Sequence, residues 1–325
     1  MSVLVYAENS GGKFKKSSFE AISYGNEIAR MSGSDLKVIS IGDVSPDELK
    51  KPGNYGAKKI LNAAADNLKS FTNQAYAAVI AEAAKAEDAK VIVLSASFSG
   101  KGLAPRIAIK LEAGLADGAV SLPDVTNGFK VRKTAFSGKA FADVTLTSER
   151  KIITLIPNSY KVVEDIKQPE MADFNPPIAD ADFKMVIKET IRASDKISLP
   201  DAELVVSGGR GLKGPENWGM VEELAGLLGA ATACSKPVSD ANWRPHSEHV
   251  GQTGISISPN LYVAIGISGA IQHLAGVSSS KNIVVINKDP EAPFFKAADY
   301  GIVGDAFEVI PKLIEAIKKF KSAHA

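Results

Sequence analysis

The sequence contains a single cysteine, no long apolar run and almost no net charge. With Cys234 alone, the chain cannot build a disulfide framework or a cysteine metal site, and a reducing compartment is expected. No apolar run approaches the roughly 20 residues that a helix needs to span a bilayer, so we expect no membrane insertion. The 38 basic and 37 acidic side chains nearly cancel, which leaves no field that would attract nucleic acid.

A targeting segment is also missing from the start of the sequence. Residues 1–6 enter a predicted strand without a basic leader or an apolar h-region, so we expect an unprocessed cytoplasmic chain of the bacterial type. With 325 residues and 45% apolar composition, the chain is long enough to form two cores. The polar stretch 194–200 predicts the boundary between them, which gives domains at 1–195 and 196–325.

The first domain shows strands that alternate with helices, which predicts a parallel sheet covered on both faces. Ser17 is followed three residues later by Glu20, a spacing that predicts a capping box at the start of the first helix. The last helix of this series is expected to hold Pro105 in its first turn. The predicted strands are 3–7, 36–41, 91–95, 152–156 and 183–187, and the predicted helices are 17–31, 57–69, 72–85 and one that opens within 95–102.

Two segments of the first domain depart from this alternation. Residues 129–146 alternate apolar and polar side chains and have glycines at 128 and 138, which predicts an antiparallel hairpin at the sheet edge. Residues 168–182 are rich in proline and aspartate and predict a surface loop. The segment 95–102 suits either a phosphate cradle or a helix-capping turn, and the lack of a G-x-x-x-x-G-K-[ST] spacing favours the turn.

The second domain begins with a strand, 203–206, followed by a glycine-rich turn. Gly209, Gly211 and Gly214 form a G-x-G-x-x-G pattern, but the carboxylate expected about 20 residues later in a dinucleotide-binding fingerprint is not evident. Arg210 lies inside the turn, where it would either bind a phosphate or point to solvent. A helix over 221–228 follows.

One loop and two histidines are further candidate polar groups of the second domain. Residues 234–240 predict a loop that leaves Ser235 and Lys236 free to meet a ligand. His246 and His249 superficially resemble a metal site, but no third ligand is nearby. A solvated loop is therefore the favoured interpretation of the two histidines.

Two unbroken apolar runs, 261–267 and 283–286, predict strands that are buried on both faces of a parallel sheet. Each run is followed first by a small or polar residue. Because ligands of open α/β sheets bind beyond the carboxyl ends of the strands, the two tips predict one shared cleft. His273 follows the first tip at a predicted helix start, as either a ligand contact or an ordinary capping or core histidine.

Five motifs around this cleft resemble electron transfer flavoprotein α subunits and occur in the same order as in that family. The resemblance is specific over about 203–320 and weaker over the first domain. The motifs are SGGRG at 207–211, VGQTG at 250–254, LYVAIGISGAIQHLAG at 261–276, INKDPEAP at 286–293 and ADYGIV at 298–303.

The resemblance implies a C-terminal doubly wound parallel-sheet domain that binds FAD, after an N-terminal nucleotide-binding-like domain, similar to adenine nucleotide hydrolases, that contacts a separate β subunit. Thr253 would lie near flavin N5 and His273 near the O2 carbonyl. Lys236 stands where the family usually has arginine, so the charge is kept but the planar fork is lost. The implied FAD-binding residues are Arg210 near the pyrophosphate and flavin; Ser235, Lys236, Val250, Gly251, Gln252 and Thr253 along the isoalloxazine; Ser268, Gly269, Ala270, Ile271, Gln272 and His273 across the flavin edge and pyrophosphate; and Asn287, Asp305 and Ala306 at the ribose and adenine end.

The implied function is electron transfer, with no catalytic or metal-ligating residue. The heterodimer would accept electrons from acyl-CoA and related dehydrogenases in fatty acid β-oxidation and pass them to electron transfer flavoprotein–quinone oxidoreductase of the respiratory chain. Positive charge at His273, Arg210 and Lys236 is expected to favour an anionic, one-electron-reduced flavin. Two alternatives stay open on the residues alone: an oxidoreductase that acts directly on a small substrate, and a nucleotide-sensing module based on the N-terminal domain.

Overall fold

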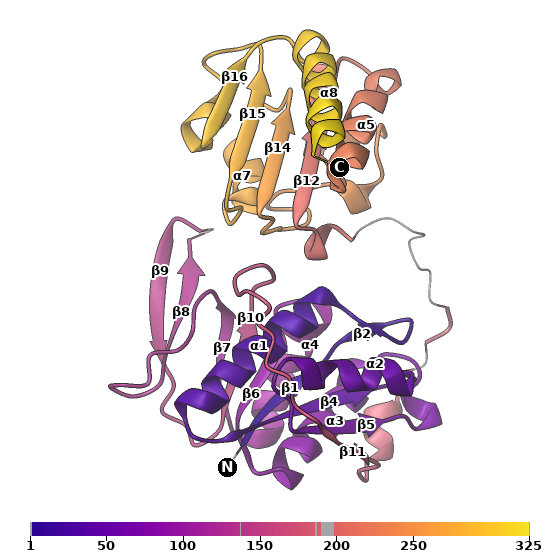
Figure 1. Ribbon diagram of the computed structural model, residues 1–325, viewed down its shortest axis with the longest axis vertical. Helices are drawn as coiled ribbons and strands as arrows, with labels where there is room; N and C mark the ends of the chain where they lie inside the picture. The colour runs from indigo at the N-terminus through magenta and orange to yellow at the C-terminus, as the bar shows by residue number, and fades with distance from the viewer. Residues whose placement is uncertain (1, 137, 186, 190–197, 325) are drawn as a thin grey trace. The chain divides into compact units, whose positions relative to one another are not determined.

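The chain is built on two sheets, one in each of two units: a mainly parallel sheet in the first and a wholly parallel sheet in the second. The computed structural model describes residues 2–136, 138–185, 187–189 and 198–324. The N-terminal unit consists of Met1–Ala135 and Ala140–Arg192, and the C-terminal unit of Phe136–Lys139 and Ala193–Ala325 (Figure 1). The predicted boundary between residues 195 and 196 lies outside the described residues. The α/β class predicted for both parts is confirmed.

The sheet of the N-terminal unit has nine strands in the order β11-β5-β4-β1-β6-β10-β7-β8-β9. Neighbouring strands are parallel except in the pairs β7–β8 and β8–β9, so the predicted hairpin does form an antiparallel edge. The central strands are apolar runs buried on both faces, as expected for parallel strands beneath helices. The strands are β1 (Ser2–Tyr6), β4 (Asp35–Ile41), β5 (Lys59–Ala63), β6 (Ala89–Ser95), β7 (Gly114–Ala119), β8 (Lys130–Ala135), β9 (Ala140–Thr145), β10 (Lys151–Leu155) and β11 (Glu170–Asp173).

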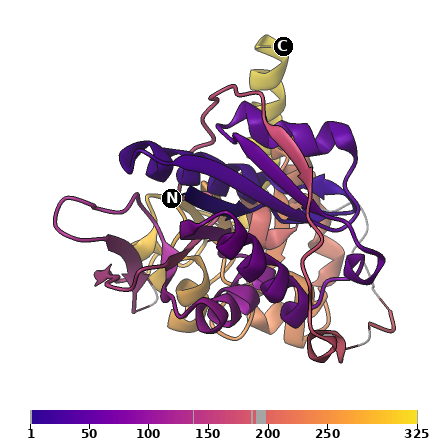
Figure 2. The same cartoon turned by 90° about the horizontal axis from the view of Figure 1, so that it is seen from below.

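Helices cover both faces of this sheet (Figure 2). On one face α1 (Lys16–Met31) packs on Val5 and its neighbours, whereas α3 (Asn73–Ala86) and α4 (Phe98–Leu111) pack on Leu4 on the other face. The smaller elements are β2 (Asn9–Ser10), β3 (Lys13–Phe14), α2 (Pro46–Lys50) and the 3-10 turns η1 (Lys51–Asn54), η2 (Asp66–Leu68) and η3 (Asp180–Phe183).

Three secondary-structure predictions for this unit are wrong. The alanine-rich segment 57–69 holds β5 and η2 instead of a helix, because Ile60 and Leu61 pack into the cores on opposite faces of the sheet. The predicted loop 168–182 contains β11, which pairs with β5 although its side chains are largely exposed. The predicted strand 183–187 begins at the end of η3 and is not a strand over 183–185, and residue 186 lies outside the described residues.

Two helix starts also differ from the predictions. α1 begins at Lys16, so Ser17 does not cap it, and Glu20 instead accepts a hydrogen bond from the Asn158 backbone N–H at 2.7 Å. α4 begins at Phe98, where the Ser97 side chain accepts a hydrogen bond from the Gly100 N–H, so Pro105 lies in the helix interior. The segment 95–102 is therefore a helix-capping turn.

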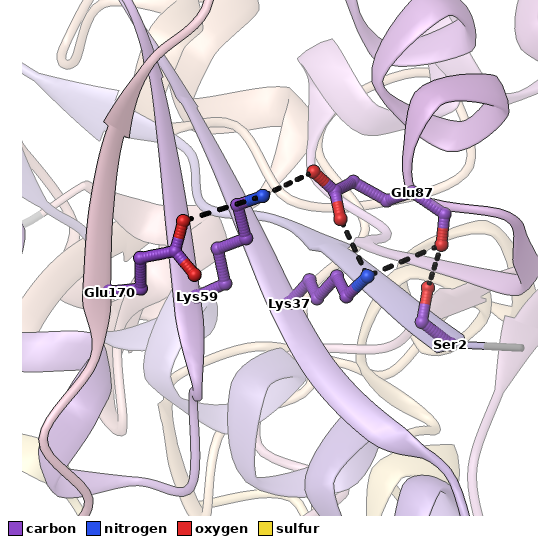
Figure 3. A network of polar contacts seen from close by, with 5 residues as sticks. All are labelled: Ser2, Lys37, Lys59, Glu87 and Glu170. Carbon is purple, nitrogen blue, oxygen red and sulfur yellow. Dashed lines mark hydrogen bonds and ion pairs between the residues drawn. The ribbon is translucent and has the colours of Figure 1, made fainter.

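A polar network fastens the amino ends of the N-terminal strands (Figure 3). Glu87, just after α3, binds Lys37 of β4 at 2.5 Å and Lys59 of β5 at 2.9 Å, and Lys59 also reaches Glu170 of β11 at 3.6 Å. Burial alone would raise the pKa of Glu87, but the hydrogen bonds from the two lysines outweigh it and hold the pKa below its usual range. The network ties the exposed strand β11 to the sheet.

The C-terminal unit contains a five-stranded, wholly parallel sheet in the order β13-β12-β14-β15-β16. α5 and α8 cover one face and α7 the other, which confirms the predicted doubly wound arrangement (Figure 1). The elements are η4 (Leu199–Asp201), β12 (Leu204–Gly208), η5 (Arg210–Leu212), η6 (Pro215–Asn217), α5 (Gly219–Leu228), β13 (Ala231–Cys234), α6 (Lys236–Asp240), η7 (His246–Glu248), β14 (Leu261–Ile265), α7 (Ile271–Val277), β15 (Ile283–Asn287), η8 (Pro293–Ala297), β16 (Tyr300–Val303) and α8 (Ala306–Ala323). Within the described part of the chain, no helix combines the length and apolarity needed to cross a membrane.

Candidate functional site

The strand order of the C-terminal sheet places a ligand-binding position at the tips of β12 and β14. The chain runs from β12 outward to β13 and then returns to β14 on the other side, so the order reverses at this point. In doubly wound sheets, ligands bind beyond the carboxyl ends of the strands at such a reversal. The tips of β14 and β15 are also adjacent, with Ile265 beside Ile286, as predicted from the two apolar runs.

Glycines bring two backbone segments into direct contact at this reversal. The Gly209 N–H donates to the Ile265 carbonyl at 2.9 Å, and the Gly211 N–H donates to the Gly266 carbonyl at 3.0 Å. A Cβ on Gly209 would lie 2.3 Å from the Gly266 oxygen, and one on Gly211 would lie 2.6 Å from the Gly266 Cα. These positions therefore require glycine, which explains part of the G-x-G-x-x-G pattern. The turn continues through η5 and η6 and does not open α5 directly.

Three cationic residues lie in or near the glycine turn: Arg210 and Lys213 within it, and Lys236 next to Ser235, whose N–H donates to the Gly208 carbonyl. Arg210 and Lys236 are exposed, and neither makes a hydrogen bond or ion pair with another described residue. Lys213, which the sequence interpretation missed although it lies inside the motif, is 3.9 Å from an Asp305 carboxylate oxygen and 4.5 Å from the centre of the Phe307 ring. The edge thus presents positive charge that the chain itself leaves largely unpaired.

The segment 234–240 is not the predicted loop. It contains the end of β13 and the short helix α6, with Ser235 at the junction between them. The Ser235 N–H donates to the Gly208 carbonyl at 3.1 Å, and its side chain is buried. Lys236 is the first residue of α6, and it is exposed. It follows β13, which pairs with β12, the strand that leads into the glycine turn.

The VGQTG segment is docked onto the start of α7. The Gln252 N–H donates to the Gln272 carbonyl at 2.7 Å, and the Val250 N–H donates to the Cys234 carbonyl at 3.1 Å. A Cβ on Gly276 would lie 2.5 Å from the Gly251 nitrogen, so the two segments touch through glycine. The contact holds the side chains of Gln252 and Thr253 in solvent-exposed positions.

The segment between β14 and α7 is fixed by Phe294. The Phe294 N–H donates to the Ser268 carbonyl at 3.1 Å, and a Cβ on Gly269 would lie 2.5 Å from Phe294. Gly269 has φ +82°, which also favours glycine. Ser268, Ala270 and the first two residues of α7, Ile271 and Gln272, are left exposed, so this segment contributes both backbone and side-chain groups to the edge.

His273 is buried beneath this edge, with 7% of its surface exposed. Its Nε2 lies 2.8 Å from the Tyr262 hydroxyl, and its ring meets the edge of Phe294. Burial and, less strongly, the neighbouring His249 lower the pKa of His273 to about 4, against a weak opposing effect of the Val250 backbone. The imidazole is thus neutral at neutral pH, and its expected contribution of positive charge would require protonation of the ring.

The residues predicted for the ribose and adenine end lie at the carboxyl end of β15 and the start of α8. Asn287 donates from its side-chain nitrogen to the Ile267 carbonyl at 3.0 Å, and its backbone carbonyl accepts from Gly304 at 3.0 Å. Asp305 caps α8 by accepting a hydrogen bond from the Phe307 N–H at 3.0 Å. Ala306, the first residue of α8, is buried.

The predicted site residues therefore gather at the strand tips of a single sheet. The edge offers glycine-lined backbone, exposed cations and polar side chains, a combination suited to an anionic ligand with hydrogen-bonding groups. Among the described residues, neither His246 and His249 nor any other His, Cys, Asp or Glu side chains form a group of three that could hold a metal ion.

Comparison with known proteins covers both units. The electron transfer flavoprotein domain matches residues 3–185, and the electron transfer flavoprotein FAD-binding domain matches residues 198–278. The electron transfer flavoprotein subunit alpha of Thermoanaerobacterium thermosaccharolyticum is 37% identical over 324 residues, which cover 98% of each chain. That of Bacillus subtilis is 38% identical over 319 residues, covering 98% of this chain and 97% of the relative. The acryloyl-CoA reductase electron transfer subunit beta of Anaerotignum propionicum is 33% identical over 354 residues, covering 99% and 96%.

Proposed function

Because the chain belongs to the electron transfer flavoprotein α-subunit family, we propose that its C-terminal unit carries FAD. Members of this family are electron carriers and not enzymes that convert a substrate. The observation that carries the proposal is the strand reversal at β12 and β14, where glycine backbone and uncommitted cations meet. The FAD-binding family match over 198–278 covers that reversal.

The proposed division of roles follows the position of each residue on the edge. Arg210, in the glycine turn, would neutralise the pyrophosphate, and Lys236 would add positive charge near the flavin. Val250, Gly251, Gln252 and Thr253 would line the isoalloxazine together with Ser235. Ser268, Gly269, Ala270, Ile271, Gln272 and His273 would contact the flavin edge and the pyrophosphate, and Asn287, Asp305 and Ala306 would hold the ribose and adenine end.

The protein's own contribution would be to bind, orient and shield the cofactor. When bound, FAD supplies the capacity to accept and release electrons. The docked VGQTG segment holds Thr253 and Gln252 at fixed positions, so their polar groups can orient a ring without a large loss of freedom. Neutral His273 would act as a hydrogen-bonding group, with its ring held by Tyr262 and Phe294.

The proposed physiological role is electron transfer between dehydrogenases and a quinone reductase. We expect a heterodimer with an electron transfer flavoprotein β subunit that accepts electrons from acyl-CoA and other dehydrogenases in fatty acid β-oxidation, in the cytoplasm. The acceptor would be electron transfer flavoprotein–quinone oxidoreductase. The relatives' names, which include "subunit alpha" and an acryloyl-CoA reductase electron transfer subunit, support assembly with another chain and a coenzyme A thioester pathway.

Co-expression with a β subunit and an absorption spectrum of the purified heterodimer test this proposal. We expect a yellow protein whose flavin bleaches stepwise during dithionite titration, and we expect FAD when the released cofactor is identified by chromatography. A correctly folded, colourless heterodimer that does not take up added FAD would contradict the proposal.

A further inference from the structure

An arginine holds the loop between α6 and the VGQTG segment. Over residues 241–247 most side chains are exposed, and only Trp243 and Arg244 are partly buried. Arg244 donates two hydrogen bonds to the Glu248 carboxylate, from Nε at 2.8 Å and from Nη2 at 2.7 Å, and a third from Nη1 to Glu222 of α5 at 3.0 Å. A two-pronged contact of this kind fixes the orientation of the guanidinium and the carboxylate as well as their distance.

The Arg244–Glu248 pair is largely shielded from water. The side chain of Arg244 is 15% exposed and that of Glu248 is 9% exposed, so their attraction is screened less than that of a surface pair. The ion pair between Lys318 of α8 and Glu223 of α5, by contrast, has side chains that are 54% and 50% exposed. The Arg244–Glu248 pair is therefore suited to fix a position, whereas the Lys318–Glu223 pair is not.

Glu248 leads directly into the segment proposed to line the isoalloxazine. The carbonyl of the next residue, His249, accepts a hydrogen bond from the Ile255 N–H at 2.9 Å. A Cβ on Gly254 would lie 2.4 Å from the same carbonyl oxygen, so the turn 250–255 is folded directly against His249. The position of this turn therefore depends on the backbone that Glu248 anchors.

The Arg244 guanidinium also contacts the residue that packs on the start of the glycine turn. Its central carbon lies 5.3 Å from the centre of the Trp218 ring, a cation–π contact with a residue that is only 3% exposed. Trp218 in turn packs on Gly208, the last residue of β12, since a Cβ on that glycine would lie 2.7 Å from two of the ring carbons. Arg244 thus connects the glycine turn, through Trp218, with the VGQTG segment, through Glu248.

We propose that Arg244 is a positioning residue for the flavin: through Glu248 it fixes the VGQTG segment relative to the glycine turn, and so it determines how tightly the isoalloxazine is held. This inference rests on the proposed binding of FAD. Arg244 acts through its two neighbours and not by contact with the cofactor. Groups that orient a ligand need fixed supports of their own, so loss of the arginine should loosen the site while every residue that touches the ligand is still present.

The test compares Arg244→Gln with Lys318→Gln in the heterodimer with a β subunit. Fluorescence titration of the flavin-free heterodimer with FAD should show an affinity about tenfold lower in Arg244→Gln, within the range that coupled contacts transmit. The visible circular dichroism of the bound flavin should also change, because the groups around its ring are displaced. Lys318→Gln removes the exposed ion pair of α5 and should change neither property.

A conservative variant separates charge from geometry. Arg244→Lys keeps the positive charge but cannot make the two-pronged contact with Glu248. Its FAD affinity and its flavin spectrum should therefore lie between those of the wild type and Arg244→Gln.

Amide hydrogen exchange gives a measurement that does not need the cofactor. The Val250 N–H donates to the Cys234 carbonyl, and the Gln252 N–H donates to the Gln272 carbonyl. In the flavin-free heterodimer, Arg244→Gln should speed the exchange of these two amides by a larger factor than that of the amides of β14, because the turn is released locally.

Wild-type FAD affinity together with an unchanged flavin spectrum in Arg244→Gln would overturn the inference even if the variant is less stable, since Arg244 would then act on stability alone. If Arg244→Gln does not fold, the same result in Arg244→Lys overturns it. If neither the wild type nor Lys318→Gln binds FAD, the proposed function fails. Amide exchange then still tests the positioning, and equal exchange of the Val250 and Gln252 amides in the wild type and Arg244→Gln overturns it.

Discussion

The strand order of both sheets reverses in the same way, but different groups of the chain lie at the point of reversal. In the N-terminal unit the order reverses at β1, between β4 and β6, and the chain's own Glu8 lies just beyond it with 6% of its surface exposed. Glu8 binds Lys15 Nζ at 2.6 Å and accepts a hydrogen bond from Ser97 at 2.5 Å. In the C-terminal unit, glycines and the uncommitted Arg210 occupy the equivalent point.

The comparison indicates that the topology alone does not make a binding site. The cap of α4, where an anion would be stabilised by the helix, is already bound to the Glu8 carboxylate through Ser97. The C-terminal edge has no such carboxylate in contact with Arg210 among the described residues, so its cation is available to a ligand. This difference argues against the nucleotide-sensing alternative for the N-terminal domain and in favour of a single cofactor site.

The largest effect is expected from Glu8→Ala. Removing the carboxylate deletes the ion pair with the partly buried Lys15 and the hydrogen bond from Ser97, and loss of one member of a buried pair typically costs about 3 kcal/mol of unfolding free energy. The N-terminal unit should be destabilised while the C-terminal unit is not. Both tryptophans, Trp218 and Trp243, belong to the C-terminal unit, so their fluorescence reports that unit alone and far-UV circular dichroism reports the whole chain.

The control for Glu8→Ala is Asp47→Ala. The Asp47 side chain is 96% exposed and pairs only with its helix neighbour Lys50 among the described contacts, so its loss should change stability little. If the two substitutions lower the free energy of unfolding equally, then Glu8 does not have the proposed structural role at the strand reversal of the N-terminal sheet.

The second effect is a difference in acid stability between the units. The pKa of His273 falls from 6.5 to about 4 on folding, so the unfolded chain binds a proton at this residue more readily than the folded chain does. The free energy of unfolding is therefore unaffected by this group above about pH 6.5 and decreases as the pH falls towards 4. The loss amounts to about 3 kcal/mol at most. Glu87, whose pKa is also lowered, begins to weaken the N-terminal unit only below its usual pKa of 4.5. Mild acid should therefore weaken the C-terminal unit first.

Chemical denaturation followed by tryptophan fluorescence at a series of pH values measures this effect. His273→Gln should flatten the dependence between the two pKa values of His273, even though the variant is less stable throughout. A dependence that stays as steep in the variant as in the wild type would assign the acid sensitivity to another group.

The third effect comes from the glycine contact at the C-terminal reversal. Gly209→Ala places a Cβ 2.3 Å from a backbone oxygen that cannot move aside easily, and overpacking of this kind costs about 1–3 kcal/mol. FAD binding should weaken along with stability. Gly226→Ala is the matched control, because nothing lies within 4 Å of its Cβ position and alanine favours a helix, so it should stabilise the unit by about 0.5–1 kcal/mol.

The parts of the fold that could be predicted are those that the local sequence determines. The apolar runs of β14 and β15 need burial on both faces, which predicts internal strands of one parallel sheet with their carboxyl ends at the same edge, and the two strands are indeed paired. β11 could not be predicted, because its exposed side chains carry no strand pattern and it pairs with β5 alone among the described strands. β5 was missed because pairing on both sides overrides its alanine-rich surroundings.

The candidate site shows the same limit. The motifs located Arg210 and the glycines, whose roles follow from residue type and spacing. The neutral state of His273 depends on burial and on His249, which is 24 positions earlier in the chain, and such through-space effects have no signature in the local sequence. Lys213 was overlooked for a related reason, since its contacts with Asp305 and Phe307 arise only when the start of α8 is placed beside the glycine turn.

The smallest effect is expected from Arg210→Ala. The side chain is exposed and makes no hydrogen bond or ion pair with another described residue, so the unfolding free energy should change by no more than about 0.5 kcal/mol. FAD binding should weaken about tenfold, or about 1.4 kcal/mol, because one charge-assisted interaction with the pyrophosphate is lost. Arg210→Lys keeps the charge but loses the planar guanidinium, so its FAD affinity should lie between those of the wild type and Arg210→Ala. Fluorescence titration of the flavin-free heterodimer with FAD measures these affinities. Titration at low and at high salt separates the effect of the positive charge from that of the guanidinium geometry, because salt screens only the charge. Unchanged FAD affinity in Arg210→Ala would mean that the exposed guanidinium faces solvent, and the contrast between the two sheet edges would then rest on the glycine backbone alone.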